Sequence, residues 1–235
     1  MTLGMSDFIF APPAPASLPV IGQDRRFPVG RIFCVGRNYA AHAAEMGSEV
    51  DREAPFYFLK SLHAVQQGGG TMPYPPGTSD LHHEIELVVA IGAPAFRVTP
   101  AQAGAAIWGY GAGLDLTRRD LQAKAKAMQR SWDLGKNFEG AAVLAPLTPA
   151  RDFRPGGQRI HLAVNGVTRQ DSAISDMVWS IPEIIADLSL YYHLAPGDLI
   201  MTGTPAGVGA LLPGDQVTGG VEGLAPVDLT IGPAE

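Results

Sequence analysis

Residues 82–92 read HHEIELVVAIG and carry the strongest fold signal in the chain. The second half of this stretch is an unbroken apolar run, which predicts a buried β-strand. Side chains at positions i and i+2 of a strand point to the same face, with their Cα atoms about 7 Å apart. We therefore expect Glu84 and Glu86 to face the same way, at the start of a strand that is otherwise apolar.

A third acid is predicted to end another strand. Residues 109–117 read GYGAGLDLT and indicate a short strand that ends at Asp115. Buried like charges are costly unless one is protonated or a cation lies between them. Three carboxylates without a cysteine suit a hard ion such as Mg²⁺ or Mn²⁺ rather than zinc. The pattern alone is equally compatible with a strand end that carries solvated acids.

The composition is that of a globular protein. Its 235 residues suit one large domain or a domain with a small appendage, and 46% hydrophobic residues suffice for a full core. A net charge of -6 without a basic run argues against a nucleic-acid partner. Because we find no apolar stretch of about 18 residues and no signal peptide, we expect no membrane association and a cytoplasmic location.

Helices and strands are predicted without a regular alternation, which favours an α+β fold over a doubly wound sheet. Strand patterns occur at residues 31–36, 56–60, 84–92, 109–117 and 199–202, and Asn165-Gly166 predicts a hairpin over 160–170. Helices are predicted within 36–47, near 100–107, over 118–131 and from the capping box at Ser180 and Glu183. We expect residues 1–30 to form an arm or small appendage and 31–235 to form the main domain.

A histidine and a glutamate share one face of the first predicted helix. His42 and Glu45 are three residues apart, so their side chains are close enough to form a hydrogen bond. A carboxylate beside an imidazole fixes its tautomer and makes it a better base. The pair indicates a general base for water, although a surface histidine beside a helix-face glutamate gives the same spacing.

Several groups are candidates for binding an anionic substrate. Arg37 follows a strand and a glycine, where a turn would aim its guanidinium at a cleft. Lys136 has bulky apolar neighbours that would desolvate it. The glycines of residues 203–209, which read GTPAGVG, let the amides of Gly203 and Thr204 approach a carboxylate or an oxyanion. The other candidate cations are Lys60, Arg118 and Arg119, with a solvated surface charge as the alternative for each.

Taken together and in this order, the segments resemble the fumarylacetoacetate hydrolase family, from about Arg31 to the C-terminus. The matching segments are residues 36–42, 82–87, 113–120, 132–136, 164–166, 180–185 and 197–209. The likeness is strongest to the short branch that cleaves acylpyruvates. It implies a roll of mixed β-sheets with peripheral helices, a homodimer, and Mg²⁺ or Mn²⁺ held by Glu84, Glu86 and Asp115.

The resemblance also implies an activity, the hydrolysis of a C–C bond in a small anionic 2,4-diketo acid. The expected substrate is 3-fumarylpyruvate, an intermediate of gentisate-type aromatic degradation, and the products are fumarate and pyruvate. His42, oriented by Glu45, is expected to deprotonate the attacking water, and Lys136 to stabilise the pyruvate enolate. Arg118 or Arg119, with Gln122, would grip the distal carboxylate from the helix at 118–131. Few large apolar residues lie along that helix, so we expect it to act as a lid.

One residue departs from the family pattern, and other functions stay open. Glu139 would repel an anionic substrate, so we expect that it points away or that the preferred substrate differs. The same metal site could serve oxaloacetate decarboxylation or dienoate isomerisation, neither of which needs an attacking water. A protein that binds metal or ligand without catalysis is a further alternative, although the His42–Glu45 pair argues against it.

Overall fold

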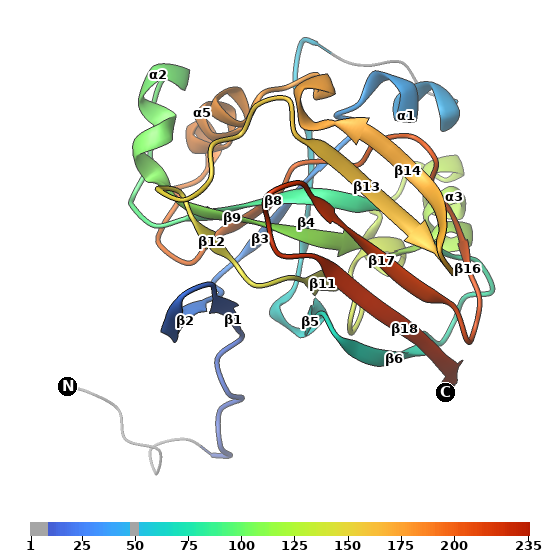
Figure 1. Ribbon diagram of the computed structural model, residues 1–235. Helices are drawn as coiled ribbons and strands as arrows, with labels where there is room; N and C mark the ends of the chain where they lie inside the picture. The colour runs from blue at the N-terminus through green and yellow to red at the C-terminus, as the bar shows by residue number, and fades with distance from the viewer. Residues whose placement is uncertain (1–8, 48–51) are drawn as a thin grey trace.

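The computed structural model describes residues 9–47 and 52–235 (Figure 1). The α-helices in these ranges are short and are α1 (Ala40–Glu45), α2 (Pro100–Ala103), α3 (Arg119–Ala127), α4 (Asp133–Lys136) and α5 (Ile181–Tyr191). The strands up to the second acidic segment are β1 (Ser17–Val20), β2 (Gln23–Pro28), β3 (Ile32–Gly36), β4 (Phe56–Lys60), β5 (Val65–Gln67), β6 (Gly70–Tyr74), β7 (Leu81–His83), β8 (Ile85–Ile91), β9 (Ile107–Asp115) and β10 (Thr117–Arg118). The later strands are β11 (Ala142–Leu144), β12 (Thr148–Pro149), β13 (Arg159–Val164), β14 (Val167–Ala173), β15 (Leu199–Met201), β16 (Gly209–Leu211), β17 (Gln216–Val221) and β18 (Val227–Ala234).

Two large mixed sheets make up the body of the described chain. The larger, eight-stranded sheet runs β4-β3-β15-β8-β9-β11-β5, with β12 paired to β9 beside this path. The second sheet has five strands in the order β14-β13-β17-β18-β6. Most neighbours are antiparallel, whereas β3 with β15, β5 with β11 and β6 with β18 are parallel. The helices lie outside the sheets (Figure 1), which confirms the predicted α+β class of mixed sheets with peripheral helices.

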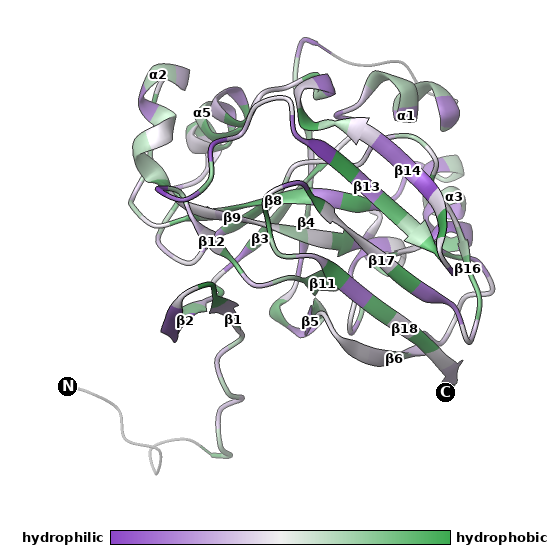
Figure 2. Cartoon of the chain, in the orientation of Figure 1, coloured by the Kyte–Doolittle hydropathy of each residue, from purple (hydrophilic) through white to green (hydrophobic). Residues whose placement is uncertain are grey.

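The core lies where the five-stranded sheet crosses β8 and β9. Strands β13, β17 and β18 contact these two strands and lie in front of them in Figure 1. Burial alternates along β13, where Ile160, Leu162 and Val164 are buried, and the same alternation of hydropathy is visible in Figure 2. Strand β8, in contrast, is buried at every position. A charged residue in β8 is therefore held away from water.

The predicted turns and caps are present. Asn165 and Gly166 join β13 to β14, and both have positive φ angles, 52° and 77°, as a two-residue hairpin turn requires. Helix α5 begins with the predicted capping box, in which the backbone amide and the hydroxyl of Ser180 both donate a hydrogen bond to Glu183 Oε2. The helix predicted at 118–131 is shorter, because β10 extends to Arg118 and the chain turns at Met128.

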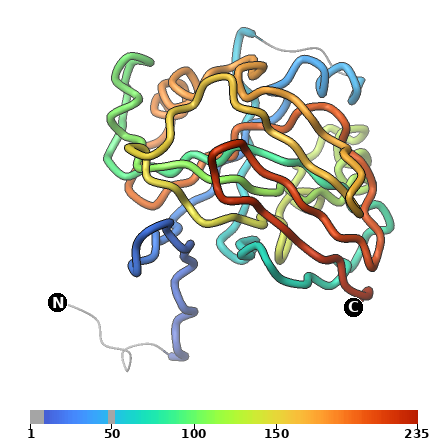
Figure 3. Tube along the Cα trace, viewed as in Figure 1, coloured from blue at the N-terminus to red at the C-terminus, as the bar shows by residue number. Residues whose placement is uncertain are grey.

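The N-terminal hairpin is tied to the rest of the molecule. Leu18 and Phe27 belong to the main core, and the ring of Phe27 lies 5.1 Å from that of Trp108. Residues 9–15 are exposed and extend away from the sheets (Figure 3), and residues 1–8 lie outside the described part of the chain. The division into an arm at 1–30 and a main domain at 31–235 stays a prediction. Among the described residues, no helix has the length and apolar character needed to span a membrane.

Candidate metal centre and active site

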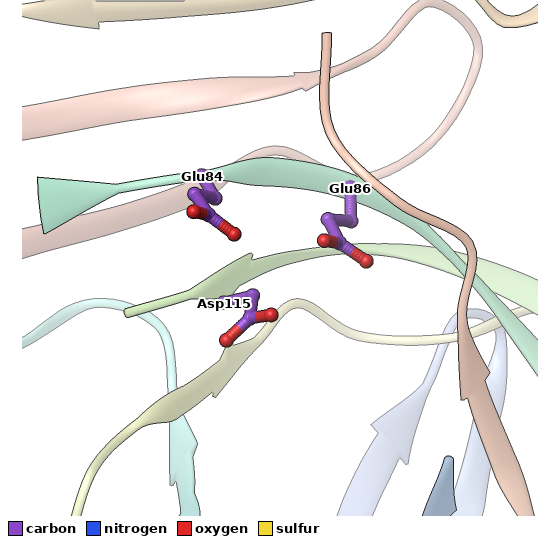
Figure 4. Close-up of side chains that lie close together, drawn as sticks. All are labelled: Glu84, Glu86 and Asp115. Carbon is purple, nitrogen blue, oxygen red and sulfur yellow. The ribbon is translucent and has the colours of Figure 1, made fainter. Parts of the chain in front are cut away.

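Three carboxylates from neighbouring strands meet in the interior (Figure 4). Glu84 immediately precedes β8, Glu86 lies within it, and Asp115 is the last residue of β9. The two strands are antiparallel, and the amide of Asp115 donates to the carbonyl of Glu84 at 2.8 Å. One oxygen from each carboxylate lies within 4.8 Å of the others, and all three residues are buried. The predicted meeting of these acids is confirmed.

Three cations surround two of these acids. The Lys136 ammonium donates to Glu84 Oε2 at 2.6 Å and to Asp115 Oδ2 at 2.8 Å. Arg119 donates to the other oxygen of Glu84, and Lys60 Nζ lies 2.8 Å from Asp115 Oδ1. Burial alone would raise the pKa of Glu84, but Lys136 and Arg119 hold that pKa below its ordinary value. Glu84 is therefore a carboxylate anion.

Glu86 has a different environment from the other two acids. Its Oε2 accepts a hydrogen bond from the Gly203 amide at 2.8 Å, and among the described residues no cation forms an ion pair with it. Burial, followed by the charges of Asp115 and Glu84, raises the pKa of Glu86 well above its ordinary value. Asp115 Oδ1 is also buried and makes no hydrogen bond, although the Lys60 ammonium is near it.

The donor set fits a hard divalent cation. Its three ligand groups are carboxylates, which Mg²⁺ and Mn²⁺ prefer, and each carboxylate oxygen can accept more than one partner. A cation beside Glu86 would neutralise the one acid of the three that lacks a cationic side chain. The triad is thus a divalent-metal site, and its charge distribution explains why such an ion is needed there.

His42 and Glu45 form the predicted pair at the edge of the same pocket. Glu45 Oε2 lies 3.3 Å from His42 Nδ1, and both oxygens of Glu45 accept a hydrogen bond from the Gly207 amide at 3.1 Å. Burial lowers the pKa of His42 below its ordinary value, an effect only partly opposed by Glu84 and by the hydrogen bond to Glu45. The imidazole is therefore neutral near pH 7, with Nε2 available as a base when Nδ1 donates to Glu45.

Arg37 also lines this pocket, as its position after a strand and glycine predicted. Its backbone has φ 59°, a left-handed conformation that costs a non-glycine residue about 1–3 kcal/mol. The next residue holds this turn, because the side chain of Asn38 bonds to the backbone of Thr202 and Trp179. Strain that is fixed by buried hydrogen bonds in a pocket points to a functional side chain.

Helix α3 contributes Arg119 and Gln122 to the pocket, and both are buried. Arg119 donates to Gln122 Oε1 at 2.7 Å and to His82 Nδ1 at 3.3 Å, in addition to Glu84. A Cβ atom on Gly135 would meet the backbone nitrogen of Gln122 at 2.9 Å, so α3 and α4 pack closely. Helix α3 thus lies beside the carboxylates, and its closure over them as a lid stays a prediction.

A family comparison agrees with this geometry. The model of the fumarylacetoacetate (FAA) hydrolase C-terminal region matches residues 31–231. The chain belongs to the fumarylacetoacetate hydrolase family. The match spans all of the pocket residues described above and both large sheets except the last three residues of β18, so the family resemblance of the separate segments is confirmed.

Individual family members differ in their named activities. A fumarylpyruvate hydrolase of Ralstonia sp. is 52% identical over 192 residues, which are 81% of this chain and 100% of the relative. The crystal structure of a fumarylpyruvate hydrolase from Pseudomonas aeruginosa, in complex with Mn²⁺ and pyruvate, superposes with a TM-score of 0.93 at 44% identity, covering 96% of this chain and 99% of that one. An oxaloacetate tautomerase of Escherichia coli is 40% identical over 194 residues, covering 82% of this chain and 88% of the relative.

Some predicted substrate-binding groups lie elsewhere in this member of the fumarylacetoacetate hydrolase family. Lys60 does not line the pocket; its buried ammonium donates to the carbonyls of Leu116 and Lys136 beneath the acids. Arg118 lies over the ring of Phe138 and lines a separate pocket together with Glu139. Glu139 is exposed and does not line the metal pocket, so the repulsion expected from it does not arise there.

The glycine-rich loop also differs from its predicted role. The Gly203 amide is used to hold Glu86 and is therefore not available to an oxyanion in this structure. Thr204 does line the pocket, and its hydroxyl oxygen accepts a hydrogen bond from Gln170 at 2.7 Å. The loop thus positions Glu86 through one residue and presents a side chain to the pocket through the next.

Two residues of the site were missed by the sequence analysis, one that supports the pocket and one that lines it. Gln170 is fully buried and uses its amide four times: it accepts from His83 and Ile85 and donates to Thr204 and Pro205. It thereby joins the five-stranded sheet to the strand of the glutamates and to the loop. Lys126, on the inner side of α3, also lines the pocket. A glutamine in an edge hairpin and a lysine in a polar helix give no distinctive sequence signal.

Proposed function

We propose that this chain is a divalent-metal-dependent hydrolase of 2,4-diketo acids that converts 3-fumarylpyruvate to fumarate and pyruvate. The observation that carries the proposal is one pocket lined by the three metal carboxylates and by His42, whose Nδ1 lies beside Glu45. The likeness to two fumarylpyruvate hydrolases, one of them in complex with pyruvate, supports the choice of substrate.

We propose Mg²⁺ or Mn²⁺ as the metal, held by Glu84, Glu86 and Asp115. When bound, such an ion supplies a Lewis acid that stabilises negative charge on substrate oxygens. Lys136 places a second positive charge at the same point. Although burial would lower the pKa of Lys136, Asp115 and Glu84 raise it above its ordinary value, so the side chain remains an ammonium.

The hydrolytic step uses His42 as the base. Its Nε2 takes a proton from water while the water oxygen adds to the C4 carbonyl of the substrate. Glu45, fixed by the Gly207 amide, keeps the imidazole in the required tautomer and stabilises the imidazolium that forms. The C3–C4 bond then breaks, and its electron pair leaves with the pyruvate half as an enolate. The proton held by His42 is available to return to C3, which completes pyruvate.

A second function is favoured by other members of the family. The Escherichia coli relative and an Arabidopsis thaliana relative, the latter 40% identical over 209 residues, are named oxaloacetate tautomerases. Tautomerisation moves a proton at C3 and breaks no C–C bond. The same pocket offers His42 as a base and Lys136 beside the enolate oxygen, so this reaction is the principal alternative.

Pyruvate release decides between the two functions. Purified protein with Mn²⁺ would be assayed on 3-fumarylpyruvate, acetylpyruvate and oxaloacetate, with and without a chelator. The proposal requires chelator-sensitive release of pyruvate and fumarate from fumarylpyruvate. Rapid decay of the enol form of oxaloacetate, without release of pyruvate from either acylpyruvate, would show a tautomerase instead.

A further inference from the structure

Two cations that face the metal pocket have no partner of opposite charge among residues 9–47 and 52–235. Lys126 and Arg37 both line the pocket and are half-buried. Within the part of the chain that the structure describes, neither side chain donates a hydrogen bond or forms an ion pair. The other pocket cations, Arg119 and Lys136, are both bound to Glu84. Lys126 and Arg37 are thus the pocket cations left for an incoming anion.

Each of these two cations lies over one ring of an aromatic pair. The Lys126 ammonium lies 5.1 Å from the ring centroid of Trp132, and the Arg37 guanidinium lies 5.8 Å from that of Phe56. The two rings are in contact, with centroids 4.6 Å apart. Cation–π contact stabilises each charge without using its hydrogen-bond donors. The donors of both cations therefore remain free to bind a carboxylate.

The electrostatic environment of Lys126 is unfavourable without an anion. Burial, and then the positive charges of Arg119 and Arg37, lower the pKa of Lys126 below its ordinary value, and Glu84 opposes them in part. A metal ion on the triad would add further positive charge. A bound carboxylate would relieve this repulsion, so the pocket is suited to an anion with a charge at each end.

We propose that Lys126, together with Arg37, binds the distal carboxylate of a dianionic 2-oxo acid whose other carboxylate lies at the metal triad. This inference deepens the proposed function, because 3-fumarylpyruvate carries carboxylates at both ends. In this proposal Lys126 and Arg37 bind the distal carboxylate, a role that the sequence analysis expected for Arg118 or Arg119 with Gln122. Phe58 and Trp132, which also line the pocket, flank the chain between the two carboxylates.

The geometry also explains selectivity. An acylpyruvate without a distal carboxylate, such as acetylpyruvate, leaves Lys126 and Arg37 unpaired and partly desolvated when the pocket closes. A charge-assisted hydrogen bond is among the stronger polar contacts in a protein, and its loss reduces affinity by roughly tenfold or more. The preference for a dianionic substrate should therefore reside in Lys126 and Arg37 and not in the metal centre.

The test compares two unreactive ligands that differ only in the distal carboxylate. 2-Oxoheptanedioate has the same number of carbon atoms as fumarylpyruvate but lacks the 4-oxo group and the double bond, and 2-oxoheptanoate has a methyl group in place of the distal carboxylate. Binding of each to the Mn²⁺-loaded protein is measured by calorimetry. We expect the parent protein to prefer 2-oxoheptanedioate by about tenfold or more, and Lys126→Met to lose most of this preference.

Two further variants control for fold and for general charge. Lys126→Arg keeps the charge and should keep most of the preference. Lys124→Met removes an exposed lysine two residues away on the same helix and should leave the preference unchanged. Mn²⁺ affinity and circular dichroism report whether each variant is folded, and Lys126→Gln replaces Lys126→Met if the latter is not.

The outcomes separate this inference from the proposed function. A Lys126→Met protein that is folded and retains the parental preference overturns the inference, as does an equal loss in Lys124→Met. A parent protein without any preference for the dianion also overturns it. A parent protein that prefers the dianion through Lys126 but releases no pyruvate from fumarylpyruvate contradicts the proposed hydrolysis and leaves the inference standing.

Discussion

Glu86 and Glu84 lie two residues apart on one strand but differ in how their charge is compensated. Glu84 is paired with Lys136 and Arg119, whereas Glu86 has only the Gly203 amide. Both would serve as metal ligands. Their removal should therefore have the same effect on metal binding and different effects on the stability of the metal-free protein.

Replacing either glutamate with glutamine should weaken Mn²⁺ binding in a calorimetric titration. In chelator, Glu84→Gln should also lower the free energy of unfolding by about 3 kcal/mol, because two buried cations lose their partner. Glu86→Gln should leave the metal-free protein as stable as the parent or more stable, since it removes a carboxyl group whose ionisation is opposed by burial and by the charges of Asp115 and Glu84. Unchanged Mn²⁺ affinity in both variants would contradict the metal assignment.

His42 is expected to act only in its neutral form. His42→Ala should reduce turnover by about a hundred- to ten-thousand-fold while leaving oxalate affinity nearly unchanged. Because the pKa of His42 is lowered, the fall of kcat/KM on the acid side should lie below the ordinary histidine value of about 6.5. Glu45→Gln removes a group that raises this pKa, so in this variant the acid-side fall of kcat/KM should occur at a still lower pH.

These measurements are made at saturating Mn²⁺, so that loss of metal in acid does not mimic protonation of His42. A His42→Ala turnover within about threefold of the parent would show that another group activates the water. A shift of the acid limb to higher pH in Glu45→Gln would mean that the profile reports a different residue.

Helix α3 connects the metal centre to the outer wall of the pocket. Its first turn is anchored by Arg119 and by Asp120, which accepts hydrogen bonds from Thr78 and Ser79. Beyond Gln122 the helix is more exposed, and apart from Lys126 no side chain of this half lines the pocket. The pocket lined by the triad and by α3 is narrow, with a volume of about 30 Å³, so we expect a diketo acid to shift part of this wall when it binds.

We therefore predict that residues 119–127 change their protection when ligand binds. Hydrogen exchange with Mg²⁺ and oxalate should be slower than in the ligand-free protein, and the effect should be larger after Gln122 than before it. Slower exchange follows from closure, which excludes water from the charged centre. The same exchange rates in both states would show that α3 is a fixed part of the scaffold, and the lid hypothesis would be abandoned.

At the level of the whole molecule, exposed apolar side chains mark a surface that is suited to association with a second chain. Phe56 and Leu59 on the edge strand β4 are 40% and 45% exposed, and Tyr191 near the end of α5 is 69% exposed. An edge strand that carries such residues is a favourable surface for association. We propose that the chain is a homodimer, as the family resemblance implied.

Sedimentation equilibrium tests the dimer directly. At micromolar concentration the mass should be twice the 24.8 kDa of one chain. Leu59→Lys, placed on the exposed edge, should weaken the association if β4 takes part, whereas Lys124→Met on the exposed side of α3 should not. A mass of one chain over the whole concentration range would contradict the dimer.

Much of the fold could be predicted from short sequence patterns, because the elements that they predict depend on local interactions. The apolar run of β8, the Asn165-Gly166 turn and the Ser180 capping box each depend on residues within a few positions of one another. The i, i+2 spacing of the glutamates and the i, i+3 spacing of His42 and Glu45 likewise placed these pairs correctly, because strand and helix periodicity fix their directions.

The end of α3 was less predictable. The lysine- and alanine-rich composition favours helix as far as residue 131, yet the helix ends at Ala127 and Gln129 adopts φ 52°. Trp132 packs against Phe56 from a distant strand, so the segment before it has to leave the helix axis. Tertiary packing here overrides a weak local propensity.

The types and spacing of the chemical groups were thus contained in the chain itself: three carboxylates, a histidine with its glutamate, and a lysine among apolar neighbours. The sequence did not show which cations form ion pairs with the carboxylates and which remain available to bind substrate. Lys60, Arg118, Arg119 and Lys126 look alike in sequence, and the Gly203 amide looks free. Their roles depend on distances between residues far apart in the chain, because ion pairing and desolvation act through space and not along the backbone.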